Sequence, residues 1–236
     1  MIAMAMMALL TIPSYRHAAN KKKSATHPVP PYGEAHAKLY DALYDSADKI
    51  RFETSVIEEG AHVLDVGCGV GHLVGNLPSA VGLDASPHMI SEAQRRYPDR
   101  TFKVGNATDL SLFPKESFST VVCVGYTLYY MPEKLAFFET AYQWLEPEGF
   151  MVLQLSNERM KVSPHRKNFR HKGRHVGNVW REQIEYNGSM VYSEHVFYYE
   201  PIAFLTELAE RVGFKLQAKT QYPHDPAQFL VVFQKS

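Results

Sequence analysis

The chain has 236 residues, of which 45% are hydrophobic, so it is long enough to bury a substantial core and excludes an intrinsically disordered protein. Two cysteines exclude a disulfide framework and a four-cysteine zinc site, and they indicate a reducing, cytoplasmic compartment. The formal net charge is zero, which removes any whole-molecule argument for binding nucleic acid, because nucleic-acid-binding domains carry excess basic charge.

The first thirty residues are predicted to be a flexible tail. Residues 1–10 are apolar, but they lack the basic leader of a signal peptide and are too short to span a bilayer. Residues 11–31 hold several prolines and a run of three lysines, as is typical of a linker. We favour a flexible tail over a short docking helix, because chain ends are usually loose unless something fastens them. No membrane span is expected.

From residue 31 onward, predicted helices and strands alternate. A helical pattern covers 32–59, and helices are expected over 71–77, 86–97 and 133–145. Between them, short apolar strands are expected over 61–66, 80–84, 101–104, 119–124 and 150–155. This alternation predicts an α/β fold with a parallel sheet, covered by helices on both faces and joined by right-handed crossovers.

The last third of the chain departs from this rhythm. Residues 179–186 and 190–199 flank Asn187-Gly188, which predicts a β-hairpin. A helix over 201–212, closed by Gly213, precedes strands at 214–219 and 229–233 that are expected to be antiparallel at one edge. The prediction is therefore a doubly wound, mostly parallel seven-stranded sheet with an antiparallel edge strand. Its domain spans 31–236, and an inserted loop and hairpin at 155–200 form a cover.

A glycine-rich turn follows the first predicted strand. Gly67, Gly69 and Gly71 would let the backbone approach a ligand beyond the carboxyl ends of the strands. Asp84 ends the second strand, where a carboxylate can accept hydrogen bonds from both hydroxyls of a ribose. A dinucleotide site requires G-x-G-x-x-G, but His72 stands in place of its third glycine. The pattern therefore predicts a ligand with a ribose and no phosphate.

These segments resemble the motifs of class I S-adenosylmethionine-dependent methyltransferases, of the small-molecule branch. The resemblance runs from about residue 32 to the C-terminus and is carried by Val63–Leu73, Val81–Ile90, Val104–Leu110, Ser117–Pro132 and Leu145–Gly149. It implies a Rossmann-like fold, S-adenosyl-L-methionine as the cofactor and S-adenosyl-L-homocysteine as its product. It also implies an enzyme that transfers methyl groups by in-line displacement.

The resemblance further implies which residues surround the cofactor. Gly67 resembles the backbone position that approaches the methionine part, and Asp84 would hold the ribose. Asn106, where relatives often carry aspartate, and Ala107 would read the adenine. Met89 would either pack against the adenine face or fill the core. The other residues expected around the cofactor are Tyr40, Asp65, Cys68, Gly69, Ala85 and Cys123.

The methyl acceptor is expected beyond the fourth strand. The cofactor already activates its methyl group, so the protein must mainly position a nucleophile, and it needs a base only if the acceptor arrives protonated. Tyr126, Tyr130 and His195 are the predicted catalytic residues, although each has an alternative role in the core. No metal ligand is expected. Further candidates for acceptor contact are Tyr32, Tyr129 and Trp180.

The acceptor itself is only loosely defined by the sequence. A basic segment at 165–175 would either attract an anionic metabolite or form a solvated flexible loop. The predicted reaction is methyl transfer to a nitrogen or oxygen of a small metabolite. One alternative is an RNA or protein methyltransferase that docks through 165–175, and another is a non-catalytic S-adenosylmethionine-binding module. Nucleic acid is not expected as a partner, and the protein is expected to be a monomer or homodimer.

Overall fold

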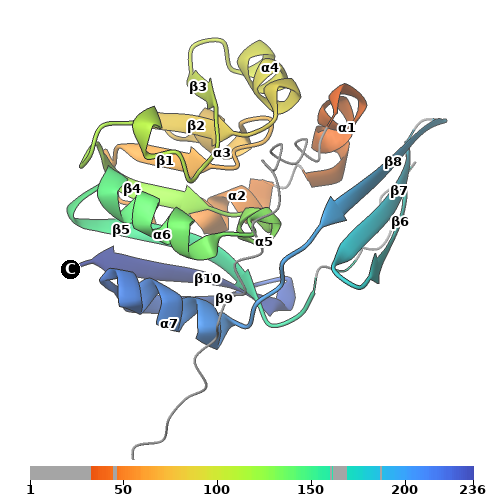
Figure 1. Cartoon of the computed structure of the whole chain (residues 1–236). Coiled ribbons are helices and arrows are strands. Elements are labelled where there is room, and N and C mark those ends of the chain that lie inside the picture. Colours follow the sequence, from red (N-terminus) through yellow and green to blue (C-terminus); the bar gives the residue numbers. More distant parts are fainter. Residues whose placement is uncertain (1–32, 45–46, 160, 162–168, 187) are drawn as a thin grey trace, which may run out of the picture.

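A computed structural model describes residues 33–44, 47–159, 161, 169–186 and 188–236. The tail predicted over 1–30 lies outside these residues. The described chain forms a seven-stranded central sheet with helices on both of its faces. A separate three-stranded sheet stands to one side of it (Figure 1). None of the described helices has the length and apolar character needed to cross a bilayer.

The central sheet has the strand order β3-β2-β1-β4-β5-β10-β9. Strands β1 to β5 are mutually parallel, and β10 is antiparallel to both of its neighbours. This confirms the predicted sheet and places its antiparallel strand one position inside the edge strand β9. The strands are β1 (Val63–Val66), β2 (Ala80–Asp84), β3 (Thr101–Val104), β4 (Phe118–Cys123), β5 (Leu145–Ser156), β9 (Phe214–Tyr222) and β10 (Asp225–Lys235).

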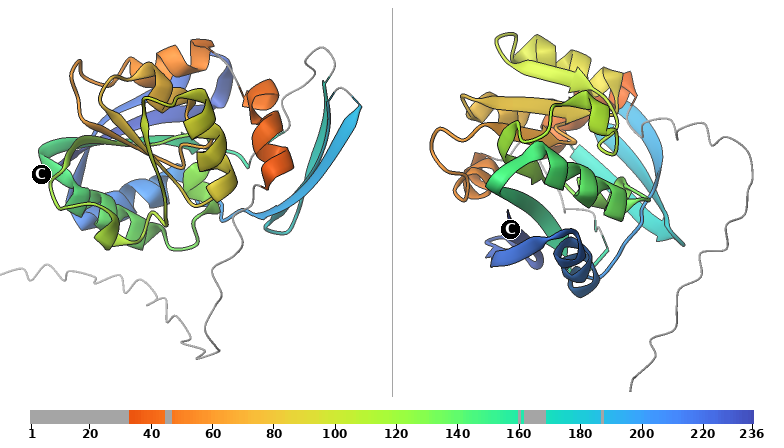
Figure 2. Two further views of the ribbon diagram at one scale, coloured as in Figure 1. Left: turned by 90° about the horizontal axis from the view of Figure 1, so that it is seen from above. Right: turned by 60° about the vertical axis from the view of Figure 1, so that its left-hand side comes forward.

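Helices cover both faces of this sheet, as Figures 1 and 2 show. One face carries α2 (Ala47–Thr54), α3 (His72–Asn76) and α4 (Pro87–Arg96), and the other carries α5 (Thr127–Tyr130), α6 (Lys134–Trp144) and α7 (Ile202–Val212). A 3₁₀ turn, η1 (Leu110–Leu112), packs against α6. The predicted helix ends are confirmed at Ser86, whose hydroxyl accepts from the Met89 N–H, and at Gly213, which ends α7 with φ +117°.

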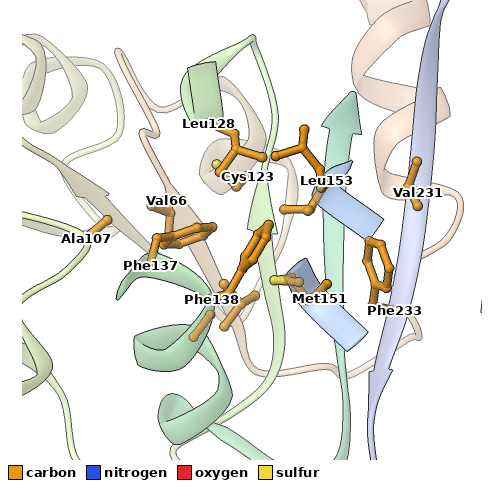
Figure 3. Packing of buried hydrophobic residues seen from close by; sticks show 14 of the residues in the cluster. Val66, Ala107, Cys123, Leu128, Phe137, Phe138, Met151, Leu153, Val231 and Phe233 are labelled. Atoms are coloured by element: carbon orange, nitrogen blue, oxygen red, sulfur yellow. The ribbon is translucent and has the colours of Figure 1, made fainter. Parts of the chain in front are cut away.

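The core follows the alternation of side chains along the strands. Leu64 and Val66 of β1 face α6, whereas Val63 lies on the opposite face among residues of α3 and α4. Phe137 and Phe138 of α6 are fully buried against the sheet (Figure 3), and burial of each stabilises the fold by about 2–3 kcal/mol. The cysteines at the ends of the first and fourth strands, Cys68 and Cys123, are both buried and both free.

The second sheet contains β6 (Phe169–Val176), β7 (Val179–Tyr186) and β8 (Ser189–Val196), in that order. Strands β7 and β8 are the predicted hairpin, with Gly188 at φ +79° in its turn. We call these three strands the cover sheet. The expectation of a solvated loop over 165–175 is wrong for its described part, because 169–176 is a strand. Its basic residues alternate with histidines at the period of a strand, so what reads as a basic run is one face of β6.

The helix α1 (Glu34–Tyr44) lies between the two sheets (Figure 2). It packs against α4 and stands between the carboxyl ends of the central strands and the cover sheet (Figure 2). The strand order reverses at β1, which has β2 on one side and β4 on the other. Ligands bind at such reversal points in open α/β sheets. The fold therefore places α1 over the end of the sheet where the glycine-rich turn lies.

Candidate active site

The glycine loop, residues 67–71, leads from β1 into α3. Its start is fastened to β2, because the N–H groups of Gly67 and Cys68 both donate to the Leu83 carbonyl at 2.7 and 3.1 Å. Gly67 has φ +73°, and a Cβ there would lie 2.2 Å from the Thr127 Cγ2 atom. Gly71 has φ +85°, and its Cβ would meet the ring of Phe102 at 2.7 Å. Both glycines are therefore required by conformation and by packing.

Gly69 and Gly125 differ from these two glycines because they present bare backbone to one ring. A Cβ at Gly69 would have the Tyr40 ring as its nearest neighbour, at 3.5 Å. At Gly125, after β4, the Tyr40 hydroxyl oxygen would be the only atom of the described residues within 4 Å, apart from the chain neighbours of this glycine. Tyr40 of α1 thus covers the two loops that end the neighbouring strands β1 and β4. This is the arrangement expected of a ligand cradle with a roof.

Asp84 is fixed at the end of β2 beside the glycine loop. One carboxylate oxygen accepts from the Gly69 N–H at 2.9 Å, and the other accepts from the Ser86 N–H at 2.8 Å. Burial raises the pKa of Asp84, while these two hydrogen bonds oppose the rise. Each carboxylate oxygen can accept more than one hydrogen bond, so both can still receive a hydroxyl. The geometry suits the ribose role that the sequence implies.

Two more carboxylates lie behind the loop. Asp65 of β1 is buried, and its burial, with Glu53 and Asp84 nearby, raises its pKa to about 8. Glu53 of α2 is also buried and accepts from the Tyr222 hydroxyl at 2.9 Å, with the Lys49 ammonium 3.5 Å away. The sequence did not single out Glu53. Its position depends on α2 docking against the distant strand β9, for which no local pattern exists.

The residues predicted to contact the adenine, Asn106, Ala107 and Met89, have other contacts within the protein. The side-chain oxygen of Asn106 accepts from both the N–H and the hydroxyl of Thr108, each at 3.1 Å. Ala107 beside it is buried, whereas Ala85 is exposed. Met89 is fully buried beneath α1 and packs with Ala37, Val70 and Tyr40. Of the two roles expected for Met89, this burial favours the core.

Tyr126 lies beside a cavity at the carboxyl end of β5. It follows β4 in the left-handed region, with φ +64°, and its pKa is raised to about 12 by burial and by Asp225. The cavity has a volume of about 460 Å³. The Gly125 N–H donates to Gln154 of β5 at 2.7 Å, which connects this region to the end of β4. Besides Tyr126, the cavity is lined by Ser156, Asn157, Glu158, Arg159, Lys161, Asp225, Pro226 and Ala227.

The other candidates for acceptor contact separate into two groups. Tyr130 stands edge-on to His195, with ring centroids 5.6 Å apart. His195 is buried in the cover sheet, where its Nε2 bonds Glu182 at 2.9 Å, and Trp180 donates to the same carboxylate. Tyr129, in contrast, is a core residue, fully buried and stacked between Phe197 and Tyr199. Tyr32 lies outside the described residues.

The described basic residues of β6 lie on the outer face of the cover sheet. Arg170, Lys172 and Arg174 are exposed there. The Arg170 guanidinium lies 3.7 Å from the carboxylate of Glu185 on β7. The intervening residue His171 points to the inner face. These cations therefore face away from the glycine loop, and they do not support the anionic acceptor that the basic segment suggested.

Comparison with known proteins yields a family and several relatives. The model of the methyltransferase domain family matches residues 37–219. The chain is 31% identical to the dTDP-3-amino-3,4,6-trideoxy-alpha-D-glucopyranose N,N-dimethyltransferase of Streptomyces venezuelae, over 52% of this chain and 58% of the relative. It is 35% identical to the erythromycin 3''-O-methyltransferase of Saccharopolyspora erythraea, over 50% of this chain and 41% of the relative. The chain thus spans about half the length of these relatives.

Solved structures share the fold. The CcbJ methyltransferase from Streptomyces caelestis superposes with a TM-score of 0.69 at 16% identity, covering 88% of this chain and 98% of its own. The amino pentose methyltransferase CalS10 from Micromonospora echinaspora, with S-adenosylmethionine bound, gives 0.65 at 18% identity, covering 87% and 98%. The family match extends over most of the chain and agrees with its strand order and glycine loop. The chain therefore belongs to the class I S-adenosylmethionine-dependent methyltransferases.

Proposed function

We propose that the protein transfers a methyl group from S-adenosylmethionine to a nitrogen or oxygen of a small polar molecule, with an amino or hydroxyl group of a sugar as the favoured acceptor. The observation that carries this proposal is the bare backbone of Gly69 and Gly125 beneath Tyr40, next to a fixed Asp84. Support for the acceptor comes from the relatives, which include the N,N-dimethyltransferase of a dTDP-linked amino sugar.

The residues around the loop suit the chemistry of this cofactor. It carries an ammonium group and a sulfonium, and three carboxylates, Glu53, Asp65 and Asp84, lie beside the loop. Asp84 would accept hydrogen bonds from the ribose hydroxyls, and Asp65 would face the cationic methionine end. When bound, the cofactor supplies an electrophilic methyl group. The chain must then hold the acceptor in line with that group and exclude water.

The cavity beside Tyr126 is the proposed acceptor region. Its volume of about 460 Å³ lies in the range of sites for small molecules. Glu158 and Asp225 in its wall suit an amine or several hydroxyls, and Arg159 and Lys161 supply the cations that an anionic substituent would need. Tyr126 would orient the acceptor from the side of β4, whereas Tyr130 and His195 contact each other and are not among the described residues that line this cavity.

Calorimetry and a turnover assay with the full chain test the proposal. We expect S-adenosylmethionine and S-adenosylhomocysteine to bind with one site per chain. We then expect S-adenosylhomocysteine to form with dTDP-3-amino-3,4,6-trideoxyglucopyranose as the probe acceptor, and not with a short single-stranded RNA. Absence of binding would overturn the assignment of the loop. Binding with no turnover on a panel of amino and hydroxyl sugars would identify a non-catalytic module.

A further inference from the structure

Three hydrogen-bonded side chains lead from Gly125, at the end of β4, to the cavity beside Tyr126. The Gly125 N–H donates to Oε1 of Gln154 at 2.7 Å. Nε2 of Gln154 donates to Oε1 of Gln228, and Nε2 of Gln228 donates to the carboxylate of Asp225. Asp225 is half-buried and lines the cavity. We call Gln154, Gln228 and Asp225 the Gln–Gln–Asp chain.

Strand pairing explains why the two glutamines meet. Strands β5 and β10 are antiparallel, and Gln228 stands opposite Ser156, which is two residues from Gln154. Both glutamine side chains therefore point to the same face of the sheet, as diagonal neighbours within reach of each other. Gln154 is 1% exposed. Burying an amide costs free energy unless its polar atoms are paired, and these contacts pair both its oxygen and its nitrogen.

The two ends of the Gln–Gln–Asp chain fix the direction of its hydrogen bonds. The Gly125 N–H can only donate, so Gln154 turns its oxygen toward Gly125 and its NH2 group toward Gln228. The Asp225 carboxylate only accepts, so Gln228 turns its NH2 group toward it. The Ala227 N–H donates to the other carboxylate oxygen at 3.0 Å. Asp225 is thus held at both oxygens, and each oxygen can still accept another hydrogen bond.

Asp225 differs from the other charged residues in the cavity wall. Glu158 forms an ion pair with Lys161, and Arg159 donates to the Gly177 carbonyl at 2.6 Å. Within the part of the chain that the structure describes, Asp225 has amide N–H donors and no ion pair. A carboxylate that faces a cavity without a counter-ion favours a ligand that brings N–H donors or positive charge.

Tyr126 connects this carboxylate with the end of β4. It directly follows Gly125 and has φ +64°, a conformation that a residue with a bulky side chain keeps only where its surroundings require it. Burial and the charge of Asp225 raise the pKa of Tyr126 to about 12, so its phenol stays protonated. The cavity wall at Tyr126 is therefore one residue along the chain from Gly125, which Tyr40 covers where the methyl donor is proposed to bind.

Fixing the turn between β9 and β10 is a simpler role, but it explains less. The turn needs only an oxygen that accepts from the Ala227 N–H, and an asparagine would supply that oxygen without a charge. The neighbouring positions on the same face as Gln154, Val152 and Leu230, are buried and apolar. The sheet itself therefore does not call for buried amides here, whereas a carboxylate held in a fixed place does.

We propose that Asp225 receives the amino group of the methyl acceptor, with Gln228 and Gln154 as positioning residues, an inference that rests on the function proposed above. The neutral amine donates an N–H to Asp225 and directs its lone pair at the methyl carbon. As the nitrogen–carbon bond forms, the carbon–sulfur bond breaks and its electron pair goes to sulfur. The positive charge passes from sulfur to nitrogen, where Asp225 balances it, and the methylated ammonium loses its proton to water after release.

The first test is the variant Asp225→Asn in the full chain, with Asp99→Asn, at an exposed position, as the control. Asparagine keeps the oxygen that accepts from Ala227 but carries no charge. Turnover is measured with dTDP-3-amino-3,4,6-trideoxyglucopyranose and with its counterpart that has a hydroxyl at the same carbon. We expect kcat/KM for the amine to fall by about tenfold to a hundredfold in Asp225→Asn, with the affinity for S-adenosylmethionine unchanged.

The ratio of kcat/KM for the amine to that for the hydroxyl separates recognition from structure. It should fall by about tenfold or more in Asp225→Asn and by about threefold or more in Gln228→Leu. It should keep its wild-type value in Gln217→Leu, at an exposed position on β9. A purely structural role would lower turnover of both acceptors alike, together with the melting temperature. An unchanged ratio in Asp225→Asn overturns the proposal.

Calorimetry separates a failure of this proposal from a failure of the proposed function. The amine is titrated into wild type and Asp225→Asn, each saturated with S-adenosylhomocysteine. Binding that is about tenfold weaker in the variant supports the role of Asp225 even without turnover, whereas equal binding, or no binding to the wild type, overturns it. A wild type that does not bind S-adenosylhomocysteine refutes the proposed function instead, and the same titration without it still decides the role of Asp225. If Asp225→Asn does not fold, Asp225→Ser replaces it, since serine also offers an acceptor to Ala227.

Discussion

The glycine loop and the Glu182 cluster are both buried polar centres beside α1, but they are built in opposite ways. The Glu182 cluster is Glu182 of the cover sheet with its hydrogen-bond partners His171, Trp180, Ser193 and His195. The loop uses backbone N–H groups and glycines, and beside it burial, with Glu53 and Asp84 nearby, raises the pKa of Asp65 to about 8. The cluster uses side chains, and four donors satisfy Glu182 completely. The loop thus keeps Asp65 and Asp84 without a cationic partner among the described residues, as the proposed methyl donor would require, whereas Glu182 already has four donors within the protein.

The two regions also respond to pH with opposite sign. Asp65 has a folded pKa above its unfolded value of 3.8, so the folded state binds more protons between about pH 4 and 8, and its contribution to stability declines as pH rises. His36 has a folded pKa below its unfolded value of 6.5, so the unfolded state binds more protons between about pH 4 and 6.5. Its contribution to stability is therefore lost as pH falls through that window.

The largest effect is expected from Gly67→Ala in the loop. The new Cβ would lie 2.2 Å from Thr127, and the backbone would force alanine to adopt φ +73°. Strain and overpacking together should lower the free energy of unfolding by about 3–4 kcal/mol in chemical denaturation, with loss of cofactor binding. Gly60→Ala is the matched control, since φ there is +80° but no atom of the described part of the chain, chain neighbours aside, would lie within 4 Å of the new Cβ. An equal loss in both variants would refute the packing argument.

Asp84→Ala should weaken cofactor binding tenfold or more. The variant removes a charged acceptor from the ribose and releases the Gly69 N–H, a loss of about 1.5–3 kcal/mol. Calorimetry with S-adenosylhomocysteine measures it, and Asp99→Ala, at an exposed position away from the loop, serves as the control. Affinity like that of the wild type would contradict the ribose role of Asp84.

His36→Phe separates the two regions by their pH dependence. Between pH 7.5 and 5 the wild type should lose about 2 kcal/mol of unfolding free energy through His36, because only the unfolded state takes up the proton. The variant should lose this slope in urea denaturation, while His88→Phe, at an exposed site on α4, should keep it. A slope that survives in His36→Phe would show that another group carries it.

The smallest signal is a proton released from Asp65. Near pH 7 this carboxyl is mostly protonated, and a cationic ligand beside it lowers its pKa, so binding should release about half a proton or more. Calorimetry of S-adenosylmethionine in phosphate and in Tris reports the release as a difference in apparent enthalpy. Asp65→Asn should abolish that difference and Asp99→Asn should not. Equal enthalpies for the wild type would argue against a charged ligand group at Asp65.

The glycine loop and the Glu182 cluster also differ in how far the sequence predicts them. The loop is encoded locally, because three glycines directly follow a strand and Asp84 ends the next one, so its position in the fold was predictable. Glu182 was not predictable, because its donors come from three strands, and one of these, β6, carries a basic run that resembles a loop. Glu53 was missed for a related reason, since its partner Tyr222 is 169 positions away in the chain. The family match supports the loop, while the roles of individual site residues stay predictions.

The spacing of His36 and Tyr40 on α1 predicts the order in which the substrates bind. His36 and Tyr40 are four residues apart, which is about one helical turn, so a single face of α1 contacts the Glu182 cluster with one residue and covers the glycine loop with the other. Because the Tyr40 ring lies at contact distance over Gly69, a methyl donor bound at the loop would have to move Tyr40, and His36 on the same face of α1 would be expected to move with it. The expected kinetic scheme is therefore an ordered one, in which the methyl donor enters first and its demethylated product leaves last.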